Sequence, residues 1–459
     1  MPRYARIAWL ASLYLVQGLP FGFQANALAV LLRQQGISLT HIALTSALAL
    51  PWSLKALWAP LVDKHWSASI GKRRSWILPM QGLLILSMVA GAFVPLSEGV
   101  TPILLLVLLM NLFAATMDIA VDGLAVDVLH ASELGIGNAT QVVGYKVGML
   151  MGGGLLVWAS AEFGLGWSGI FFLMAGVVAE VMLLSIFMRE SPRRQNVSSA
   201  DATAEHAHVR DEGPRADIAD TLTITVIMSR LREALTTPTA GWVIALLATY
   251  KLGESIVDPV FQPVLLDQGM DAADIGLLVG TFGMVASIAG SLGGGLLATR
   301  GSPLRALGYV AVFRVFALSG QWLVAGFGPF AHGWVALATC AEHLASGALT
   351  TIMFAFMMER VDRRIGATHY TVLATLEVLG KAPLSLSAGY LAEVLSVRIS
   401  FGMAVALSAM WLGLVRAAMP RLDGQESAST KENTRRTVEL PITPSDDANS
   451  VQGAQGSRE

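Results

Sequence analysis

Residues 101–127 read TPILLLVLLMNLFAATMDIAVDGLAVD, and this stretch decides the class of fold. It exceeds the roughly 20 apolar residues that a helix needs to cross the hydrocarbon core of a bilayer. Asp118 and Asp122 stand four positions apart, so on a helix both carboxylates project from one side. A charged group inside a span is costly unless it faces a cavity or a partner. The stretch therefore predicts a transmembrane helix beside a polar interior.

The rest of the chain repeats this apolar pattern. Of 459 residues, 54% are hydrophobic and 14% are charged, and the mean hydropathy is +0.59. A soluble domain carries roughly 25% charged residues, so the composition indicates an all-α polytopic membrane protein. We predict twelve transmembrane helices, near 7–32, 41–62, 75–95, 101–127, 138–161, 167–188, 240–266, 273–298, 305–327, 331–358, 367–392 and 399–419.

Charge and cysteine content exclude several classes of partner. The formal net charge is −2, which disfavours nucleic-acid binding. Cys340 is the single cysteine, so no internal disulfide is expected, and no His/Cys cluster indicates a metal site. The glycine runs at 152–154 and 293–295 follow no strand, and helix packing explains them better than phosphate binding. We expect no metal and no cofactor, with a small-molecule substrate, protons and the lipid bilayer as partners of a monomeric chain.

Basic residues predict the orientation in the membrane. Short loops rich in Lys and Arg stay cytoplasmic. In this chain the Lys and Arg residues concentrate at the N-terminus, in the loop 63–74, in the central loop 189–238, and in the loops after the eighth and tenth spans. We therefore expect an inner-membrane protein with both termini and the central loop in the cytoplasm.

An internal repeat predicts two similar halves. Residues 30–36 (VLLRQQG) resemble residues 264–269 (VLLDQG), at an offset that aligns the first two spans with the seventh and eighth. Parallel six-helix repeats are the plan of the major facilitator fold. We expect a six-helix bundle at 1–189, a cytoplasmic linker with an amphipathic membrane-surface helix at 190–238, a second bundle at 239–420 and a disordered cytoplasmic tail at 421–459.

Ionisable residues inside the spans are the candidate site. Asp118 and Asp122 have no base within a turn of their own helix, which favours proton coupling over simple pairing. On the seventh span Lys251, Glu254 and Asp258 share one face, and its excess negative charge leaves an acid free. Structural ion pairs are the alternative for each of these residues. We predict proton coupling by Asp118, Asp122, Glu254 and Asp258, and a substrate cavity containing Gln17, Lys146, Lys251, Arg314, Glu342, Glu377 and Lys381.

A charged turn follows the second span. An acid at the end of a span, followed by a basic turn, can hold the two halves together in one conformation. Positive-inside topology alone explains the basic residues but not the acid. We expect a gating latch formed by Asp63, Gly71, Arg73 and Arg74.

Several motifs resemble the peptide/acetyl-CoA/drug transporter family, a branch of the major facilitators that includes muropeptide permeases and acetyl-CoA transporters. They are YLxQGLP at 14–20, LWAPLxD at 57–63, GKRRSW at 71–76 and DIAVDG at 118–123. YKLGE at 250–254, ATHY at 367–370 and LExLGK at 376–381 look most like the branch with the animal facilitator-domain protein 3. LALPW at 48–52 and RSWILP at 74–79 are also similar to siderophore permeases of the rhizobactin/pyochelin type.

The resemblance covers residues 7–419 and implies a permease that imports a bulky polar metabolite by alternating access, as a proton symporter. Muropeptide and acetyl-CoA members usually carry Gln where this chain has Met117, so a siderophore is the first expectation for the substrate. A muropeptide, acetyl-CoA or another small molecule is the alternative. A membrane-embedded sensor or enzyme is an alternative of another class, although the spans contain no nucleophile–base or HExxH pattern and no enzyme is expected.

Overall fold

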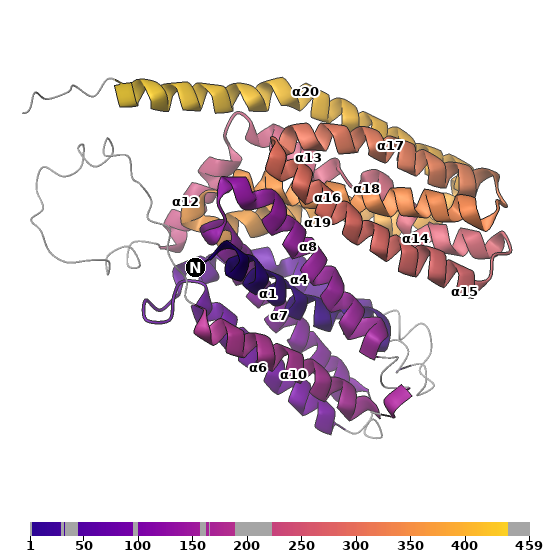
Figure 1. Cartoon of the computed structure of the whole chain (residues 1–459), viewed down its shortest axis with the longest axis horizontal. Coiled ribbons are helices and arrows are strands. Elements are labelled where there is room, and N and C mark those ends of the chain that lie inside the picture. Colours follow the sequence, from indigo (N-terminus) through magenta and orange to yellow (C-terminus); the bar gives the residue numbers. More distant parts are fainter. Residues whose placement is uncertain are drawn as a thin grey trace, which may run out of the picture. The chain divides into compact units, whose positions relative to one another are not determined.

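A computed structural model describes residues 2–28, 32, 45–94, 100–156, 162–164, 166–188 and 223–438. Within these ranges every named element is a helix, and the β-bridge between Ser67 and Gly71 is isolated. The chain divides into two compact units, 1–194 with 213–418, and 195–212 with 419–459. The first unit contains α1 to α19 and the beginning of α20 (Figure 1).

The N-terminal half of the first unit, α1 to α10, contains the first six predicted spans. Its elements are α1 (Arg3–Gly22), η1 (Phe23–Ala27), η2 (Thr45–Ala49), α4 (Leu50–Leu54), η3 (Lys55–Leu57), α5 (Ala59–Lys64), α6 (Arg74–Phe93), α7 (Thr101–Val128), η5 (Ala131–Glu133), α8 (Leu134–Leu150), η6 (Met151–Leu155) and α10 (Gly166–Phe187).

The C-terminal half, α13 to α20, contains the last six predicted spans and is preceded by α12 (Ile224–Leu235). Its elements are α13 (Ala240–Thr249), α14 (Leu252–Asp267), α15 (Ala272–Ile275), η7 (Gly276–Phe282), α16 (Gly283–Arg300), α17 (Pro303–Phe327), α18 (His332–Glu359), η8 (Arg363–Ile365), α19 (Gly366–Leu395) and α20 (Val397–Val438).

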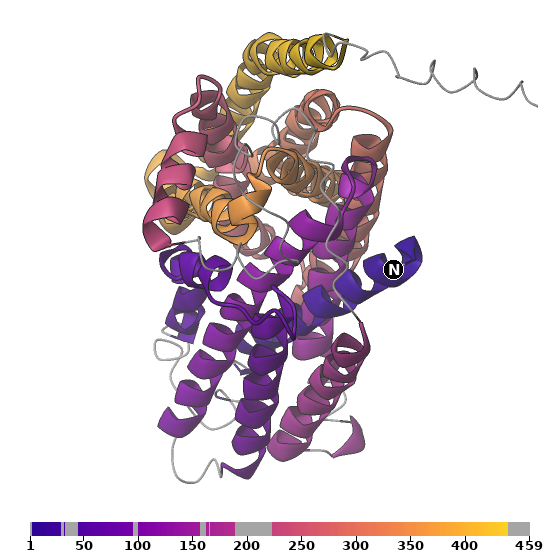
Figure 2. The ribbon, with the colours of Figure 1, turned by 90° about the vertical axis from the view of Figure 1, so that its left-hand side faces the viewer.

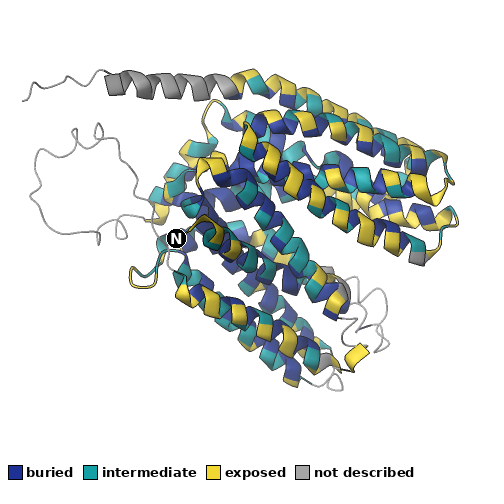
Figure 3. Ribbon diagram, in the orientation of Figure 1, coloured by how far each residue is buried: buried dark blue, intermediate teal, exposed yellow. Residues whose placement is uncertain are grey.

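Eight helical segments in the described part of the chain are long and apolar enough to cross a membrane. Large apolar side chains such as Leu86, Leu292, Phe316 and Leu386 are exposed along the helices, as contact with lipid requires (Figure 3). The all-α membrane class is therefore confirmed. The full count of twelve is consistent with the helical segments and stays a prediction.

Two spans are broken where they carry a lysine. The second span consists of short helical pieces, and Lys55 begins the 3₁₀ turn between α4 and α5. The seventh is interrupted between α13 and α14, and Lys251 caps the start of α14. Irregular backbone at membrane depth is tolerated where it lines a protein interior. Both breaks therefore indicate that the two lysines lie at one protein interior.

Glycine allows α1 and α8 to pack closely. A Cβ on Gly18 would lie 2.2 Å from the Tyr145 carbonyl oxygen, and one on Gly148 would lie 2.1 Å from the Leu15 carbonyl oxygen. Small residues at four-residue spacing bring transmembrane helices into backbone contact. A Cβ on Gly294 or Gly295 would also overlap backbone or Cβ atoms of another helix, whereas a Cβ on Gly293 would meet nothing within 4 Å. Close packing therefore explains part of the 293–295 run.

Replacing Gly148 with Leu is expected to destabilise the protein by several kcal/mol, because the side chain would overlap the backbone of α1. The measurement is the thermal unfolding midpoint of detergent-purified protein. Gly293→Leu is the matched control, since its side chain would enter open space. Equal midpoints for the two variants would contradict the close packing of α1 on α8.

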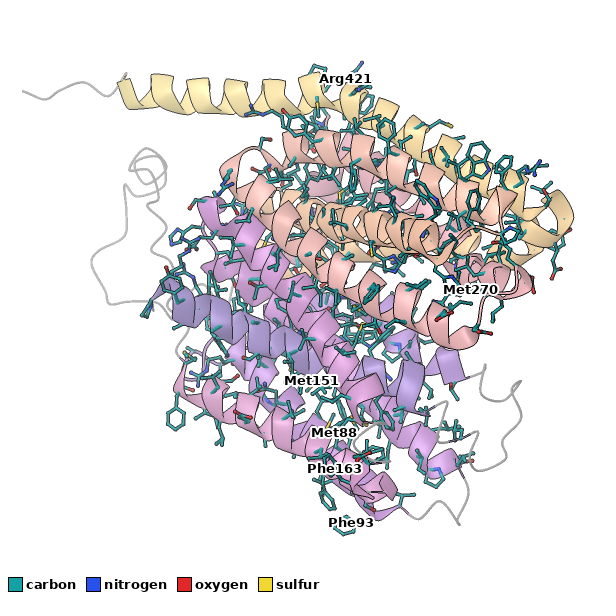
Figure 4. All side chains as sticks on the ribbon, turned by 45° about the vertical axis from the view of Figure 1, so that its right-hand side comes forward. Met88, Phe93, Met151, Phe163, Met270 and Arg421 are labelled. Atoms are coloured by element: carbon teal, nitrogen blue, oxygen red, sulfur yellow. The ribbon has the colours of Figure 1, made fainter. Side chains whose placement is uncertain are left out.

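The two halves contact each other at the end that carries Pro2, Asp63, Leu129, α12 and Arg363, which we call the linker end. There α8 packs on α16 and α18, while α19 packs on α5 and α7 (Figure 2). The opposite end, the far end, carries Phe93 and Phe163 of the N-terminal half and Met270 of the C-terminal half (Figure 4).

The linker and the tail differ from the sequence-based expectations. The described part of the linker forms α12, but its buried residues Ile227 and Leu231 pack on Ile365, so this face meets protein and not the membrane surface. Helix α20 continues to Val438, where the sequence predicts a disordered tail, and residues 425–438 contain neither Pro nor Gly to end it. Most of the linker, residues 439–459 and the first repeat copy except Leu32 lie outside the described residues.

Candidate functional site

A cavity of about 670 Å³ lies between the two halves, within the size range of small-molecule sites. Polar and charged side chains from both halves line it together with a few aromatic rings. Its charged residues are Lys55, Asp118, Asp122, Lys146, Lys251, Glu254, Asp258, Glu342, Glu377 and Lys381, with His343 beside them.

In the N-terminal half, the ammonium group of one lysine lies close to two carboxylates. The Lys55 ammonium contacts the Asp118 carboxylate and lies 4.0 Å from a carboxylate oxygen of Asp122. The Tyr14 hydroxyl and the Gln141 amide each donate a hydrogen bond of 3.0 Å to Asp122. The sequence shows no base within a turn of these aspartates on their own helix, but this does not exclude pairing with a base on another helix. Their base comes from the broken second span, not from their own helix.

In the C-terminal half, a larger network joins four elements. Arg314 donates to Glu254 at 2.6 Å and to Glu342 at 2.7 Å, and Ser346 donates to Glu254 at 2.9 Å. The Lys251 ammonium lies 3.9 Å from Glu254 and 4.0 Å from Glu377. Low dielectric makes such paired charges strongly cohesive once both partners are in place.

The eleventh span adds one more ion pair to this network. Lys381 donates to Glu377 at 2.9 Å, four residues earlier on α19. The pair that sequence spacing predicts is therefore formed, and Glu377 also faces Lys251. This links α19 to α14 through charge.

Arg314 does not line the cavity, contrary to the prediction from sequence. It is 2% exposed and lies behind Glu254 and Glu342, where it holds both carboxylates toward each other. Arg314 therefore supports the cavity wall by fixing the positions of Glu254 and Glu342. The sequence position of an arginine on its helix does not show whether its side chain reaches the cavity or lies behind the carboxylates that it pairs with.

Three further predicted residues do line the cavity. Lys146 contacts the hydroxyl of Ser287 across the two halves. Asp258 is exposed on the cavity side of α14. The buried Gln17 side chain has no hydrogen-bond partner for either amide atom within the described part of the chain. An amide in this position is suited to a hydrogen bond with a ligand or water.

Sequence reasoning missed the aromatic and amide components of the site. Tyr14 and Phe21 lie on the same helical face as Gln17, a spacing that could have identified them. The rings of Phe21, Trp52 and Tyr145 contact one another at centroid distances of 6.0 to 6.4 Å. Tyr370 donates to Gln141 at 3.3 Å from the opposite half, and only the tertiary structure pairs these two.

The residues of the predicted latch lie at the linker end. Arg73 is fully buried, donates to Asp63 at 2.7 Å and donates to Asp127 at 2.7 Å. Asp63 accepts two hydrogen bonds of 2.7 Å from Thr368, one from its backbone N–H and one from its hydroxyl. Since Thr368 belongs to the C-terminal half, Asp63 joins the halves directly.

Two members of the predicted latch act differently. Gly71 has φ +118°, a conformation that favours glycine in the turn that presents Arg73. Arg74 donates to the Ser185 and Ile186 carbonyl oxygens at the end of α10, and this contact joins α6 to α10 within the N-terminal half. Arg73 is the N-cap residue of α6 and Arg74 is its first helical residue, so the two side chains point in different directions.

The ionisation of the latch is insensitive to mild acidification. Burial alone would raise the pKa of Asp63, but Arg73, Lys72 and the Thr368 hydrogen bonds outweigh burial and lower the pKa below its usual range. A lowered pKa in the folded state means that the carboxylate's stabilising effect is present at neutral pH and is lost only as the pH falls through that lowered value.

Replacing Thr368 with Val is expected to weaken closure of the linker end by about 1 kcal/mol, because one of the two hydrogen bonds to Asp63 is lost. The measurement is thiol labelling of a cysteine placed at the buried Leu129, in a chain with Cys340 replaced by Ser. Thr371→Val is the control, since its hydroxyl has no partner in the described structure. Unchanged labelling in T368V would argue against the latch.

Two bundles around a central charged cavity, tied at one end by a latch, define a secondary transporter of the major facilitator type. Solved structures support the fold. A bacterial homologue of the iron transporter ferroportin in the outward-facing state has a TM-score of 0.64 at 14% identity, over 90% of this chain and 99% of that one. The major facilitator transporter FucP in the outward conformation has a TM-score of 0.64 at 13% identity, over 90% and 98%.

Residues 6–281 match the Acatn family, described as Acetyl-coenzyme A transporter 1, and the chain belongs to this family. It is 28% identical over 418 residues to the anhydromuropeptide permease of Escherichia coli K12, covering 91% of this chain and 78% of the relative. The relatives are transporters, so the protein is a multi-pass membrane permease and not an enzyme.

Proposed function

We propose that the protein imports a bulky, charged metabolite across the inner membrane by proton symport. The observation that carries this proposal is the cluster of Lys55 with Asp118 and Asp122 at the wall of the central cavity. Two carboxylates share one cation there, so a single added proton neutralises the cluster. Such a group changes its charge during a transport cycle at small electrostatic cost.

The cluster is connected to the other half. Asp122 accepts from Gln141, and Gln141 accepts from Tyr370 on α19. Protonation of Asp122 would alter this chain of hydrogen bonds and so affect how the halves meet. Glu254, also expected to couple protons, is held by Arg314, Lys251 and Ser346, which favours a fixed role in the wall.

The linker end is the cytoplasmic end in this proposal, because the basic loops cluster there, and both termini are cytoplasmic. The latch between Asp63 and Thr368 then closes the cytoplasmic side. A monomer is sufficient for this mechanism, since both halves come from one chain.

An anhydromuropeptide is our first substrate class, because the relative of that name aligns with 91% of this chain. Met117, which favoured a siderophore over this class, is fully buried and is not part of the cavity wall. A siderophore is the second candidate, because Trp52 of the siderophore-permease-like motif at 48–52 lines the cavity. Acetyl-CoA is the substrate that the family's name suggests.

The test is uptake into proteoliposomes with an imposed proton gradient, using labelled anhydromuropeptide, a ferric siderophore and acetyl-CoA in parallel. We expect gradient-dependent accumulation of the muropeptide. Accumulation that ignores the gradient would overturn proton coupling, and accumulation of another compound alone would replace the substrate. Binding without counterflow would indicate a sensor.

A further inference from the structure

Two ionisable side chains of the cavity have no ionic partner among the described residues. Within the described chain, every other carboxylate, lysine or arginine of the two clusters lies within 4.0 Å of an opposite charge. Lys146 and Asp258 are the exceptions, and both line the cavity. Charges kept unpaired within a membrane-spanning bundle are costly, and a ligand of opposite charge compensates that cost.

Lys146 projects from α8 of the N-terminal half. Its ammonium contacts the neutral hydroxyl of Ser287 on α16, so its charge is not compensated at that contact. The charges that act on it are Lys251, Glu254 and Glu342, all of which belong to the C-terminal network. The two carboxylates among them are already paired with Arg314. A substrate carboxylate can therefore bind to Lys146 without breaking an ion pair.

Asp258 lies one turn beyond Glu254 on α14, between the broken start of that helix and the cavity residues Phe261 and Gln262. Its carboxylate feels the like charges of Glu254 and Glu342. The cations within its electrostatic range, Arg314 and Lys251, are bound to other carboxylates. The position is accessible and locally negative, which favours an ammonium group.

We propose that Lys146 and Asp258 select a zwitterionic substrate, with its carboxylate bound to Lys146 and its ammonium bound to Asp258. The inference rests on the proposed transport function and specifies the substrate's charge pattern. A ligand lacking one of the two groups leaves a charged side chain unpaired, and sites of this kind reject such analogues strongly. A peptide with a free amine and free carboxylates fits, whereas acetyl-CoA has no ammonium group.

The two residues come from opposite halves, so a bound zwitterion would join α8 to α14 through the substrate. The contact between Lys146 and Ser287 already crosses the same interface. Binding would then favour the approach of the halves that alternating access requires.

The experiment compares three probes: an anhydromuropeptide with its free amine, the same compound with the amine acetylated, and the same compound with its carboxylates amidated. Binding is read from the ligand-induced shift in thermal unfolding, so variants that no longer transport still report. We expect the wild type to bind each modified probe about 10-fold to 100-fold more weakly than the free one.

Lys146→Gln should lose discrimination against the amidated probe and keep discrimination against the acetylated one. Asp258→Asn should show the reverse. Lys146→Met and Asp258→Ser provide second variants if either protein folds poorly. Arg305→Gln and Asp267→Asn are matched controls, since both side chains are exposed and neither lines the cavity.

The outcomes separate the two proposals. Wild-type protein that neither binds nor transports any of the probes overturns the anhydromuropeptide as the substrate class of the proposed function, and the inference with it. Wild-type protein that transports the free probe, with both variants discriminating as it does, overturns the inference alone. Loss of both discriminations in each single variant would also overturn it, because it would show general damage to the cavity.

Discussion

Arg314→Met is expected to destabilise the protein by about 3–5 kcal/mol, because it breaks a buried ion-pair network by removing its central cation. The side chain is 2% exposed and neutralises Glu254 and Glu342, which come from α14 and α18. Removing the guanidinium leaves two carboxylates without their shared cation, although Lys251 lies 3.9 Å from Glu254 and His343 lies 3.0 Å from Glu342. The measurement is the fraction of folded, monodisperse protein and its thermal unfolding midpoint in detergent.

A charge-matched variant distinguishes pairing from packing. In the triple variant Arg314→Met, Glu254→Gln, Glu342→Gln no unpaired charge remains at this position, and much of the lost stability should return. Lys381→Met is the comparison variant, because it removes the cation of a more exposed ion pair. Its side chain is 33% exposed and pairs with Glu377 on the same helix, so a cost of at most about 1 kcal/mol is expected. Similar losses for Arg314→Met and Lys381→Met would contradict the supporting role assigned to Arg314.

Asp118→Asn is expected to abolish gradient-driven uptake while the protein stays folded and still exchanges substrate in counterflow. The substitution removes the carboxylate that contacts Lys55, but Asp122 remains 4.0 Å from that ammonium, so the lysine keeps a charged partner. The remaining pair of Lys55 and Asp122 is neutral from the start, so no excess negative charge is left for a coupled proton to neutralise. Paired uptake and counterflow measurements in proteoliposomes check this result.

Asp267→Asn on α14 is the control for loss of a carboxylate, since this residue is exposed at the far end of its helix. It should leave both assays unchanged. Full gradient-driven accumulation by the Asp118→Asn protein would remove Asp118 from the coupling mechanism. Loss of counterflow together with uptake would assign Asp118 to substrate binding or folding instead.

The charged faces were predictable because helical periodicity alone places residues four apart on one side of a helix. This is why Glu377 and Lys381 pair as expected and why Asp118 and Asp122 share a wall. Periodicity does not say which residue of another helix meets that face. The sequence therefore did not reveal that Lys55 sits between the two aspartates or that Tyr370 reaches Gln141 from the other half.

Amino-acid order by itself determined the membrane class, the helical segments, the charges on each helix and the acid–base composition of the latch, because these depend on local hydropathy and helix geometry. Tertiary packing decided that Arg314 lies behind the wall, that Arg74 binds the end of α10, and that Lys146 and Asp258 face the cavity without ionic partners in the described part of the chain. The physical reason is that pairing energy falls off within a few ångströms. It therefore depends on how helices distant in sequence are brought together.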